Sequence, residues 1–320
     1  MAGPPTVACR HCGALNEADF GRCIRCGASL NDAEPADRAR RRVAATRRRG
    51  PRARGLTGPG AEPFLGRFPP EQLPGVKLII LLNLTVFTLQ LMGALTRGAD
   101  VGSAVGRSGG AFEAFLYGAL ATGPQSFLPG YTPYAEPWRL LSACFVHYGI
   151  LHIGMNLYGL LQLSRQVEPA LGTVRYVLVY VASGIAGFAT SVVWKYELFP
   201  PGSFSAGASG AVFGILGAVV GILWRQGNPA WKARASQSLI AFGVMAIVPI
   251  PIDNAAHGGG LVAGAVLAAA LAKGAPRPST AGQRVLCYLA LAGCLAAIVA
   301  PRFSPYYRLT LEEIGRRSSR

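Results

Sequence analysis

The fold of this chain is decided by one stretch near its centre, which reads GASGAVFGILGAVVGILW from Gly207 to Trp224. It contains no charged residue, and a helix of this length can cross a hydrocarbon core of about 30 Å. Its glycines recur every three or four residues, a spacing that lets membrane helices approach each other closely. The stretch therefore predicts a membrane-spanning helix packed tightly against a neighbour, with Ser209 near its start.

Six further runs of the same kind lie along the chain. The apolar runs cover residues 76–96, 149–167, 172–194, 207–224, 235–252, 254–272 and 283–300. A buried helix of a large soluble protein would explain one such run, but not seven in succession. The composition agrees, because 51% of the residues are hydrophobic and 14% are charged, whereas a soluble domain carries about 25% charged residues. These features exclude an ordinary soluble enzyme and predict an all-α polytopic membrane protein with seven spans.

The charge of the chain is strongly basic. It has 31 Lys and Arg against 15 Asp and Glu, a net charge of +16, which is typical of proteins that bind nucleic acid or a membrane surface. No groove-reading motif accompanies the charge, which argues against nucleic acid. Most basic residues before the last span fall on one side of the predicted spans, and no apolar signal segment opens the chain. We therefore expect an integral protein of the plasma (inner) membrane with a cytoplasmic amino terminus.

The sequence divides into four segments. Residues 1–30 form a cysteine-bearing module, and residues 31–75 form an Arg-rich cytoplasmic linker that is expected to be disordered. Residues 76–273 hold six of the predicted spans, and residues 274–320 hold an extra span and a basic tail. That tail contradicts the charge rule for orientation and makes the last span the weakest of the seven; its basic residues are Arg302, Arg308, Arg316, Arg317 and Arg320.

The module at the amino terminus carries Cys9-x2-Cys12 and Cys23-x2-Cys26. Four thiolates in two such pairs suit a tetrahedral structural zinc ion and resemble a short zinc ribbon. Two alternatives are a pair of disulfides and a site in which His11 replaces one cysteine; a cytoplasmic location argues against the first, and four cysteines already complete the shell. Such a module could bind a cytoplasmic partner or sense the metal, while the Arg run could contact lipid headgroups or act only as a topology signal.

Ser209 and His257 lie at matching depth on two predicted spans. Each residue lies within a turn of the predicted outer end of its span, and the two spans run in the same direction. A lone serine among glycines is usually a packing residue, and a buried structural histidine is the alternative for His257, which follows the helix-capping pair Asp253-Asn254. The shared depth nevertheless favours a dyad in which the imidazole takes the serine proton.

His152 and Asn156 are four residues apart and share one helix face. A helix break near Gly149 would bring them level with Ser209, where two side-chain donors could stabilise an oxyanion. His147 lies five residues before His152, well round the helix, and should have a different role. Taken alone, the pair would more simply form hydrogen bonds between helices.

Together these motifs resemble a family, the intramembrane serine proteases called rhomboids. The resemblance rests on His147-x4-His152-x3-Asn156, on Gly207-Ala208-Ser209-Gly210 and on His257-x2-Gly260-x3-Gly264. The pair Trp138-Arg139 is also similar to a Trp-Arg pair in the first outer loop of that family. The resemblance covers roughly residues 76–273, and the additional span resembles the six-plus-one arrangement of some members.

The resemblance implies a rhomboid-like six-helix bundle with a water-filled cavity that opens outward, plus one carboxyl-terminal transmembrane helix. Ser209 would be the nucleophile and His257 the general base, without a third acid or a catalytic cofactor. His152, Asn156 and the Ser209 amide would line the oxyanion hole, and His147 would be structural. The loop 97–148 would lie partly in the membrane plane.

The resemblance also assigns roles to small residues around the dyad. Gly207 would keep the backbone open beside the nucleophile, while Gly260 and Gly264 would hold their helix against the one that begins at Ser209 and Gly210. One residue departs from the family pattern: Phe213 stands where many members have tyrosine, so it can stack on the imidazole but offers no hydroxyl.

The expected activity is endopeptidase cleavage of single-span membrane proteins near the outer end of the span, at segments that unwind easily. Transmembrane substrates and the bilayer are thus the expected partners. Two alternatives remain: a non-catalytic binder of transmembrane clients with the same fold, and a transporter. The transporter would need ionisable groups deeper in the bundle, and the span interiors contain no Asp or Glu.

Overall fold

The computed structural model of the chain describes residues 6–9, 15–17, 21–23, 29–30, 34–35, 73–107, 110–123, 128–199, 203–247, 252–272 and 279–318. The chain divides into two compact units, Met1–Gly66 and Arg67–Arg320. Most of the linker predicted over residues 31–75 lies outside the described residues.

The described part of the first unit contains a small antiparallel sheet. Its strands are β1 (Thr6–Ala8), β2 (Leu15–Glu17) and β3 (Glu34–Pro35), in the order β2-β1-β3. The side chains of Cys9, Cys23 and Leu30 form a buried cluster beside it. Among the described residues of this unit, the cluster comprises these three side chains, with Val7 packed against it.

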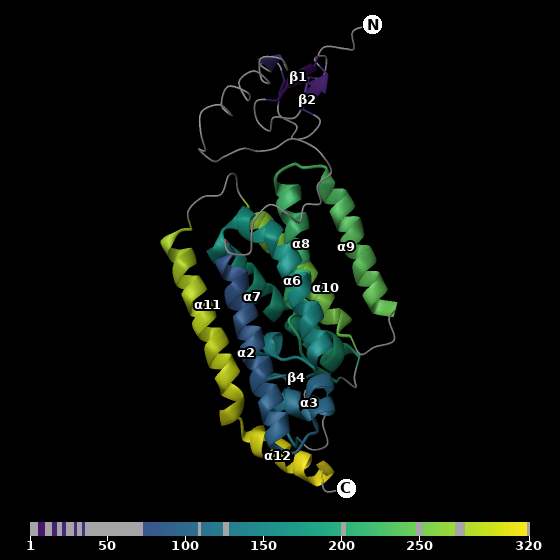
Figure 1. The fold of residues 1–320 in the computed structure, drawn as a ribbon, viewed down its shortest axis with the longest axis vertical. Helices are drawn as coiled ribbons and strands as arrows, with labels where there is room; N and C mark the ends of the chain where they lie inside the picture. The colour runs from purple at the N-terminus through teal and green to yellow at the C-terminus, as the bar shows by residue number, and fades with distance from the viewer. Residues whose placement is uncertain are drawn as a thin grey trace. The chain divides into compact units, whose positions relative to one another are not determined.

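The second unit is a bundle of apolar helices (Figure 1). Its long helices are α2 (Pro74–Thr96), α6 (Ile150–Leu171), α7 (Thr173–Val192), α8 (Ser209–Arg225), α9 (Ala230–Ile247), α10 (Asn254–Leu271) and α11 (Ala281–Val299). Helices α7, α8 and α10 pack against one another at the centre, while α9 contacts α8, and α11 contacts α7 on another side. A π-helical turn, η4 (Val193–Leu198), prolongs α7, and η5 (Ala300–Phe303) prolongs α11.

Four of these helical segments are long and apolar enough to cross a membrane: Pro74–Thr96, Thr173–Leu198, Asn254–Leu271 and Ala281–Phe303. A fifth span could be formed by a bent pair, in which α5 (Arg139–Ser142) and η3 (Ala143–Phe145) meet α6 at 95°. Helix α8 is apolar but shorter, and α9 fills the fifth predicted run only to Ile247, beyond which residues 248–251 are outside the described part. Length and composition thus support four or five spans within the described residues.

The bend before α6 occurs at Gly149, where the sequence predicts a break. Gly149 has a φ of +133° and caps α6, a backbone conformation that favours glycine. It also leaves no room for a side chain, because a Cβ atom would overlap the carbonyl oxygen of Gly106. The helix that carries His152 and Asn156 therefore starts just before them.

The segment between α2 and α6 folds into short elements. These are α3 (Val101–Arg107), α4 (Ala111–Leu116) and β4 (Leu120–Ala121), followed by α5 and η3. Strand β4 pairs antiparallel with β5 (Phe204–Ser205), with Leu120 opposite Ser205. Since β5 comes just before α8, this pairing connects the segment directly to the start of the helix that bears Ser209.

The basic tail forms a helix, α12 (Pro305–Ser318), that packs on α4 (Figure 1). Tyr306 and Leu309 of α12 join a buried cluster with Phe115, Tyr131 and Phe204. The tail is therefore a packed part of the second unit, which the sequence analysis did not foresee.

Candidate active site

Ser209 and His257 meet between the starts of two helices. Ser209 is the first residue of α8, and His257 lies in the first turn of α10. The Oγ atom of Ser209 is 2.8 Å from Nε2 of His257, and only 5% of the His257 surface is exposed. The distance is that of a hydrogen bond between the serine hydroxyl and the imidazole.

The His257 ring is held by stacking. The Phe213 ring lies one turn along α8 from Ser209, 4.3 Å from the imidazole centroid and inclined by 11°. The other ring nitrogen, Nδ1, is buried and has no hydrogen-bond partner among the residues that the structure describes. Within those residues no carboxylate is bonded to the imidazole.

The backbone before Ser209 is shaped by Gly207 and His147. Gly207 has a φ of +130° and donates from its amide to the Ala143 carbonyl oxygen, 2.9 Å away. The Ala208 amide donates to Nε2 of His147 at 3.3 Å. Gln90 in α2 holds His147 in turn, because its side-chain amide exchanges two hydrogen bonds of 3.1 Å with the His147 backbone. His147 thus supports the loop that presents Ser209.

His152 lies beside that loop and Asn156 one turn further along α6. The Tyr148 amide donates to Nδ1 of His152 at 3.2 Å, which leaves Nε2 as the nitrogen that carries the proton in the neutral ring. A Cβ atom on Gly207 would lie 2.8 Å from that Nε2 atom, so the imidazole fits only because residue 207 is glycine. The Asn156 side chain donates to the His152 carbonyl oxygen at 2.8 Å. Nε2 of His152 is therefore a donor beside the loop that precedes Ser209, and the Asn156 amide supports the same turn.

Glycines bring α8 and α10 into backbone contact. A Cβ atom at Gly260 would overlap the carbonyl oxygen of Gly210, and one at Gly264 would overlap that of Gly214. The same pattern continues along α8, where side chains at Gly217 and Gly221 would overlap carbonyl oxygens of α10. This seam fixes the separation of the two helices that carry Ser209 and His257.

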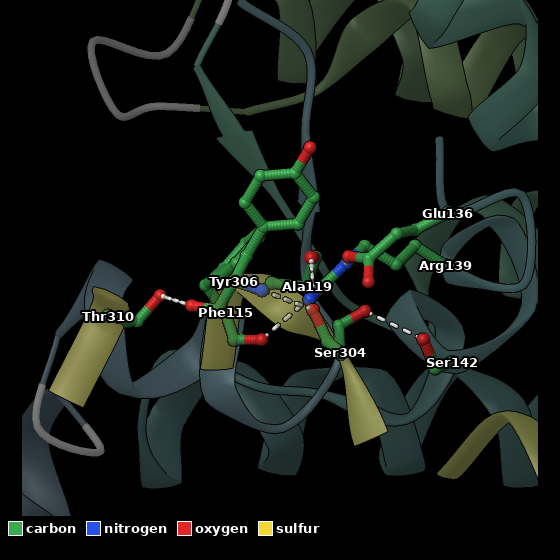
Figure 2. Close-up of polar contacts among 9 residues, drawn as sticks. Phe115, Ala119, Glu136, Arg139, Ser142, Ser304, Tyr306 and Thr310 are labelled. Atoms are coloured by element: carbon green, nitrogen blue, oxygen red, sulfur yellow. Dashed lines mark hydrogen bonds and ion pairs between the residues drawn. The ribbon is translucent and has the colours of Figure 1, made fainter. Parts of the chain in front are cut away.

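Trp138 and Arg139 anchor the segment that precedes α6. The Arg139 side chain is 1% exposed; Nε donates to Glu136 at 2.6 Å, and Nη1 donates to the carbonyl oxygens of Phe115 and Ala119 at 2.8 and 2.7 Å. Figure 2 shows these contacts converging on Arg139 from different parts of the chain. The guanidinium also lies over the rings of Phe115 and Trp138. These contacts join the start of α5 to the segment that contains Phe115 and Ala119.

Asp253 makes contacts that the sequence analysis missed. The sequence indicates only a helix cap at this position, and the structure shows that its carboxylate also binds Ser191, Lys195 and Ser205. These partners lie far from Asp253 in the sequence, and no spacing pattern marks them. The one sequence feature that could have indicated further contacts is the charge at position 253, because an uncharged asparagine would cap the helix equally well.

Of the four predicted zinc ligands, the structure describes two. Cys9 and Cys23, one from each Cys-x2-Cys pair, are both buried in the same small cluster, and the side-chain amide of Asn16 donates to the Cys23 sulfur at 3.6 Å. Cys12 and Cys26 lie outside the described residues. Among the residues that are described, no group of three or more His, Cys, Asp or Glu could hold a metal ion.

Comparison with known proteins supports the rhomboid family. Residues 134–274 match the Rhomboid domain, and residues 5–31 match a domain of unknown function (DUF7577). The chain is 34% identical over 154 residues to "Rhomboid protease GluP" of Bacillus subtilis (strain 168), covering 47% of this chain and 29% of that protein. It is 30% identical over 148 residues to "Rhomboid-like protease 3" of Toxoplasma gondii, covering 44% and 54%. Many relatives are plant proteins, such as "RHOMBOID-like protein 6, mitochondrial" of Arabidopsis thaliana, 36% identical over 133 residues that cover 40% of this chain and 42% of that protein.

Proposed function

We propose that this chain is a rhomboid-type intramembrane serine endopeptidase. Residues 134–274 match the Rhomboid domain, and the chain is similar to proteins named as proteases from two organisms. The matched region spans about a third to a half of the relatives' own length, so the activity of this chain is inferred mainly from its own site. The observation that carries the proposal is the 2.8 Å contact between Ser209 Oγ and His257 Nε2.

The chemistry proceeds in two steps from this contact. Ser209 Oγ attacks the carbonyl carbon of the scissile amide while its proton passes to Nε2 of His257, and the resulting oxyanion accepts hydrogen bonds from Nε2 of His152, the Asn156 side-chain amide and the Ser209 amide. The Ser209 amide is free to donate because the first amides of a helix have no partner within it. His257 then protonates the leaving amine, which departs and leaves an acyl-enzyme. A water molecule then attacks the ester as it gives a proton to His257, and His257 returns that proton to Ser209 Oγ as the acyl product leaves as a carboxylic acid.

The substrates that fit this site are single-span membrane proteins. A transmembrane helix hides its amides in hydrogen bonds, so segments with small or helix-breaking residues near one end should open most readily. We place the dyad near the outer surface, with the amino terminus in the cytoplasm and α8 and α9 among six spans of the bundle. Helix α11 would be the additional span.

A cleavage assay tests the proposal. The purified full chain is incubated with a single-span substrate, and wild type is compared with Ser209→Ala, His257→Ala and the control Ser238→Ala. Ser238 lies on α9, where its hydroxyl donates to the Arg234 carbonyl oxygen. We expect cleavage by wild type and Ser238→Ala only. Undiminished cleavage by either dyad variant would refute the assignment.

The same assay separates the protease from a non-catalytic binder of the same fold. A binder would retain a transmembrane client on affinity capture, with no product from wild type across several substrates. The retention of a hydrogen-bonded Ser209 and His257 favours the protease, since a binder has no need of a base on a serine hydroxyl.

We also propose a structural zinc ion in the first unit. It would be bound by Cys9, Cys12, Cys23 and Cys26, and catalysis would need no cofactor. The burial of Cys9 and Cys23 in one cluster fits this, as does the amide donated to the Cys23 sulfur, because such bonds stabilise thiolates. A zinc ion would stabilise the first unit, because the free energy of metal binding contributes to folding, and a cytoplasmic partner could bind there.

A further inference from the structure

The two oxygens of the Asp253 carboxylate have separate partners. Oδ1 accepts the Ala256 amide at 3.1 Å and thereby caps α10. Oδ2 is the acceptor for the Ser191 hydroxyl at 2.6 Å, for the Ser205 hydroxyl, and for Lys195 Nζ at 3.1 Å. One oxygen thus serves the helix end, and the other gathers donors from elsewhere in the fold.

The groups that donate to Oδ2 come from two separate parts of the fold. Ser205 belongs to β5, four residues before Ser209, whereas Ser191 and Lys195 belong to α7 and its extension η4. Asp253 is one helical turn before His257, whose amide donates to the Asp253 carbonyl oxygen at 3.0 Å. The Oδ2 atom therefore connects the strand that leads to the nucleophile with the turn that bears the base.

The bond from Ser205 to Oδ2 joins β5 directly to the residue that caps α10. The glycine contacts fix the two helices from Gly210 and Gly260 onward, but both dyad residues lie at helix starts, where backbones are held by fewer hydrogen bonds. Burial acts to raise the pKa of Asp253, yet the charge of Lys195 and the bonds from Ser191 and Ser205 outweigh it and lower that pKa. The carboxylate is accordingly charged at neutral pH and accepts strong hydrogen bonds.

We propose that Oδ2 of Asp253 is a positioning group that sets the Ser209–His257 contact by holding Ser205 against the start of α10. The inference rests on the proposed protease function. Asp253 touches neither reacting atom and acts through the backbone of β5 and α10. The simpler role, a helix cap alone, needs only Oδ1.

The substitution Asp253→Asn separates these roles. Asparagine caps helices about as well as aspartate, so its carbonyl oxygen preserves the bond from Ala256. Its amide nitrogen replaces Oδ2 and cannot accept from Ser191, Ser205 or Lys195. The double variant Asp253→Asn/Lys195→Met removes the ammonium group that the single variant leaves without its carboxylate.

The experiment measures how fast Ser209 of the purified full chain reacts with a fluorophosphonate probe, together with kcat and KM for a single-span substrate. We expect Asp253→Asn to lower the labelling rate and kcat about 10-fold or more, because small displacements of reacting groups have such effects, with KM nearly unchanged and with the variant still folded at the assay temperature. Ser205→Ala should lower the same rates, and combining it with Asp253→Asn should add little further loss. Lys195→Met should not restore the rate of Asp253→Asn.

Each other outcome is decisive. If Asp253→Asn keeps the wild-type labelling rate, Asp253 is only a helix cap and the inference is overturned. The loss of cleavage in Ser209→Ala would still support the protease in that case. Additive losses from Asp253→Asn and Ser205→Ala, or recovery through Lys195→Met, would show that Oδ2 does not act through Ser205. An unreactive Ser209 in the wild type, together with no cleavage, would refute both the protease and this inference.

Discussion

Gly260 of α10 lies directly against the backbone of Gly210 in α8, so closely that a Cβ atom at position 260 would overlap the Gly210 carbonyl oxygen. Gly210 follows Ser209, and Gly260 is three residues after His257. A contact between two residues without side chains therefore sets how closely the helices that bear Ser209 and His257 approach each other.

The first prediction concerns this seam. Gly260→Ala should destabilise the bundle by about 1–3 kcal/mol, the usual cost of overpacking, and should lower cleavage more than the stability loss alone explains, because α10 must move away from Ser209. Thermal unfolding in detergent and the cleavage rate measure the two effects. Gly258→Ala in the same helix is the control, since its Cβ would meet only the Phe242 ring at an ordinary 3.6 Å. Equal behaviour of the two variants would contradict the prediction.

The second prediction concerns the ring that stacks on the base. Phe213→Ala removes the aromatic face 4.3 Å from the His257 ring, and such contacts contribute about 0.5–1.5 kcal/mol. We expect kcat to fall roughly 2- to 10-fold with little change in folding. Phe213→Tyr keeps the face and should retain the wild-type rate. A larger loss in the tyrosine variant than in the alanine variant would argue against stacking as the cause.

The third prediction concerns Arg139, which is buried with Glu136. Arg139→Ala should destabilise the second unit by about 3–5 kcal/mol, because it leaves the Glu136 charge buried without its partner. The double variant Arg139→Met/Glu136→Gln should recover part of this loss, since neither charge is then buried. Denaturant unfolding of the detergent-solubilised chain measures both. Loss of stability no greater than in an exposed control, Arg308→Ala, would disprove the anchoring role.

The fourth prediction concerns pH. The folded state lowers the pKa of Asp253, so the carboxylate stabilises the fold fully above the ordinary aspartate pKa of about 3.9. That contribution to stability is lost as the pH falls through the lowered pKa that Asp253 has in the folded protein. The difference in unfolding midpoint between wild type and Asp253→Asn should stay constant from about pH 7 to pH 5 and shrink below about pH 4. A difference that grows on acidification would mean that the pKa is raised instead.

The fifth prediction concerns the metal. Elemental analysis of the purified chain should find about one zinc ion per chain, and Cys9→Ser/Cys12→Ser should abolish it. Cys287→Ser/Cys294→Ser is the control, because both thiols are buried in α11 and should leave the zinc content unchanged. Equal zinc in all three proteins would remove the proposed site.

Much of the site follows from local spacing. Ser209 and His257 could be paired because both begin apolar runs, and a break at Gly149 could be expected because His152 and Asn156 would otherwise lie at the wrong depth. Spacing could not predict the two hydrogen bonds between Gln90 and His147, since the position of a polar residue within one apolar helix does not identify the neighbouring segment that it contacts. The number of spans is likewise difficult to predict from the sequence, because α8 is buried on many sides and is shorter than the helices beside it.

The sequence by itself determined that the chain is a helical membrane protein and where its small and reactive residues stand along each helix, because hydrophobic length and glycine spacing are properties of one segment at a time. The tertiary structure alone decided what joins those segments. Tyr306 of the basic tail packs edge-on against Tyr131, with ring centroids 5.1 Å apart, and Oδ2 of Asp253 gathers hydroxyls from β5 and α7. Such contacts depend on how distant segments fold back on one another, and a polar side chain takes the partner that burial brings to it.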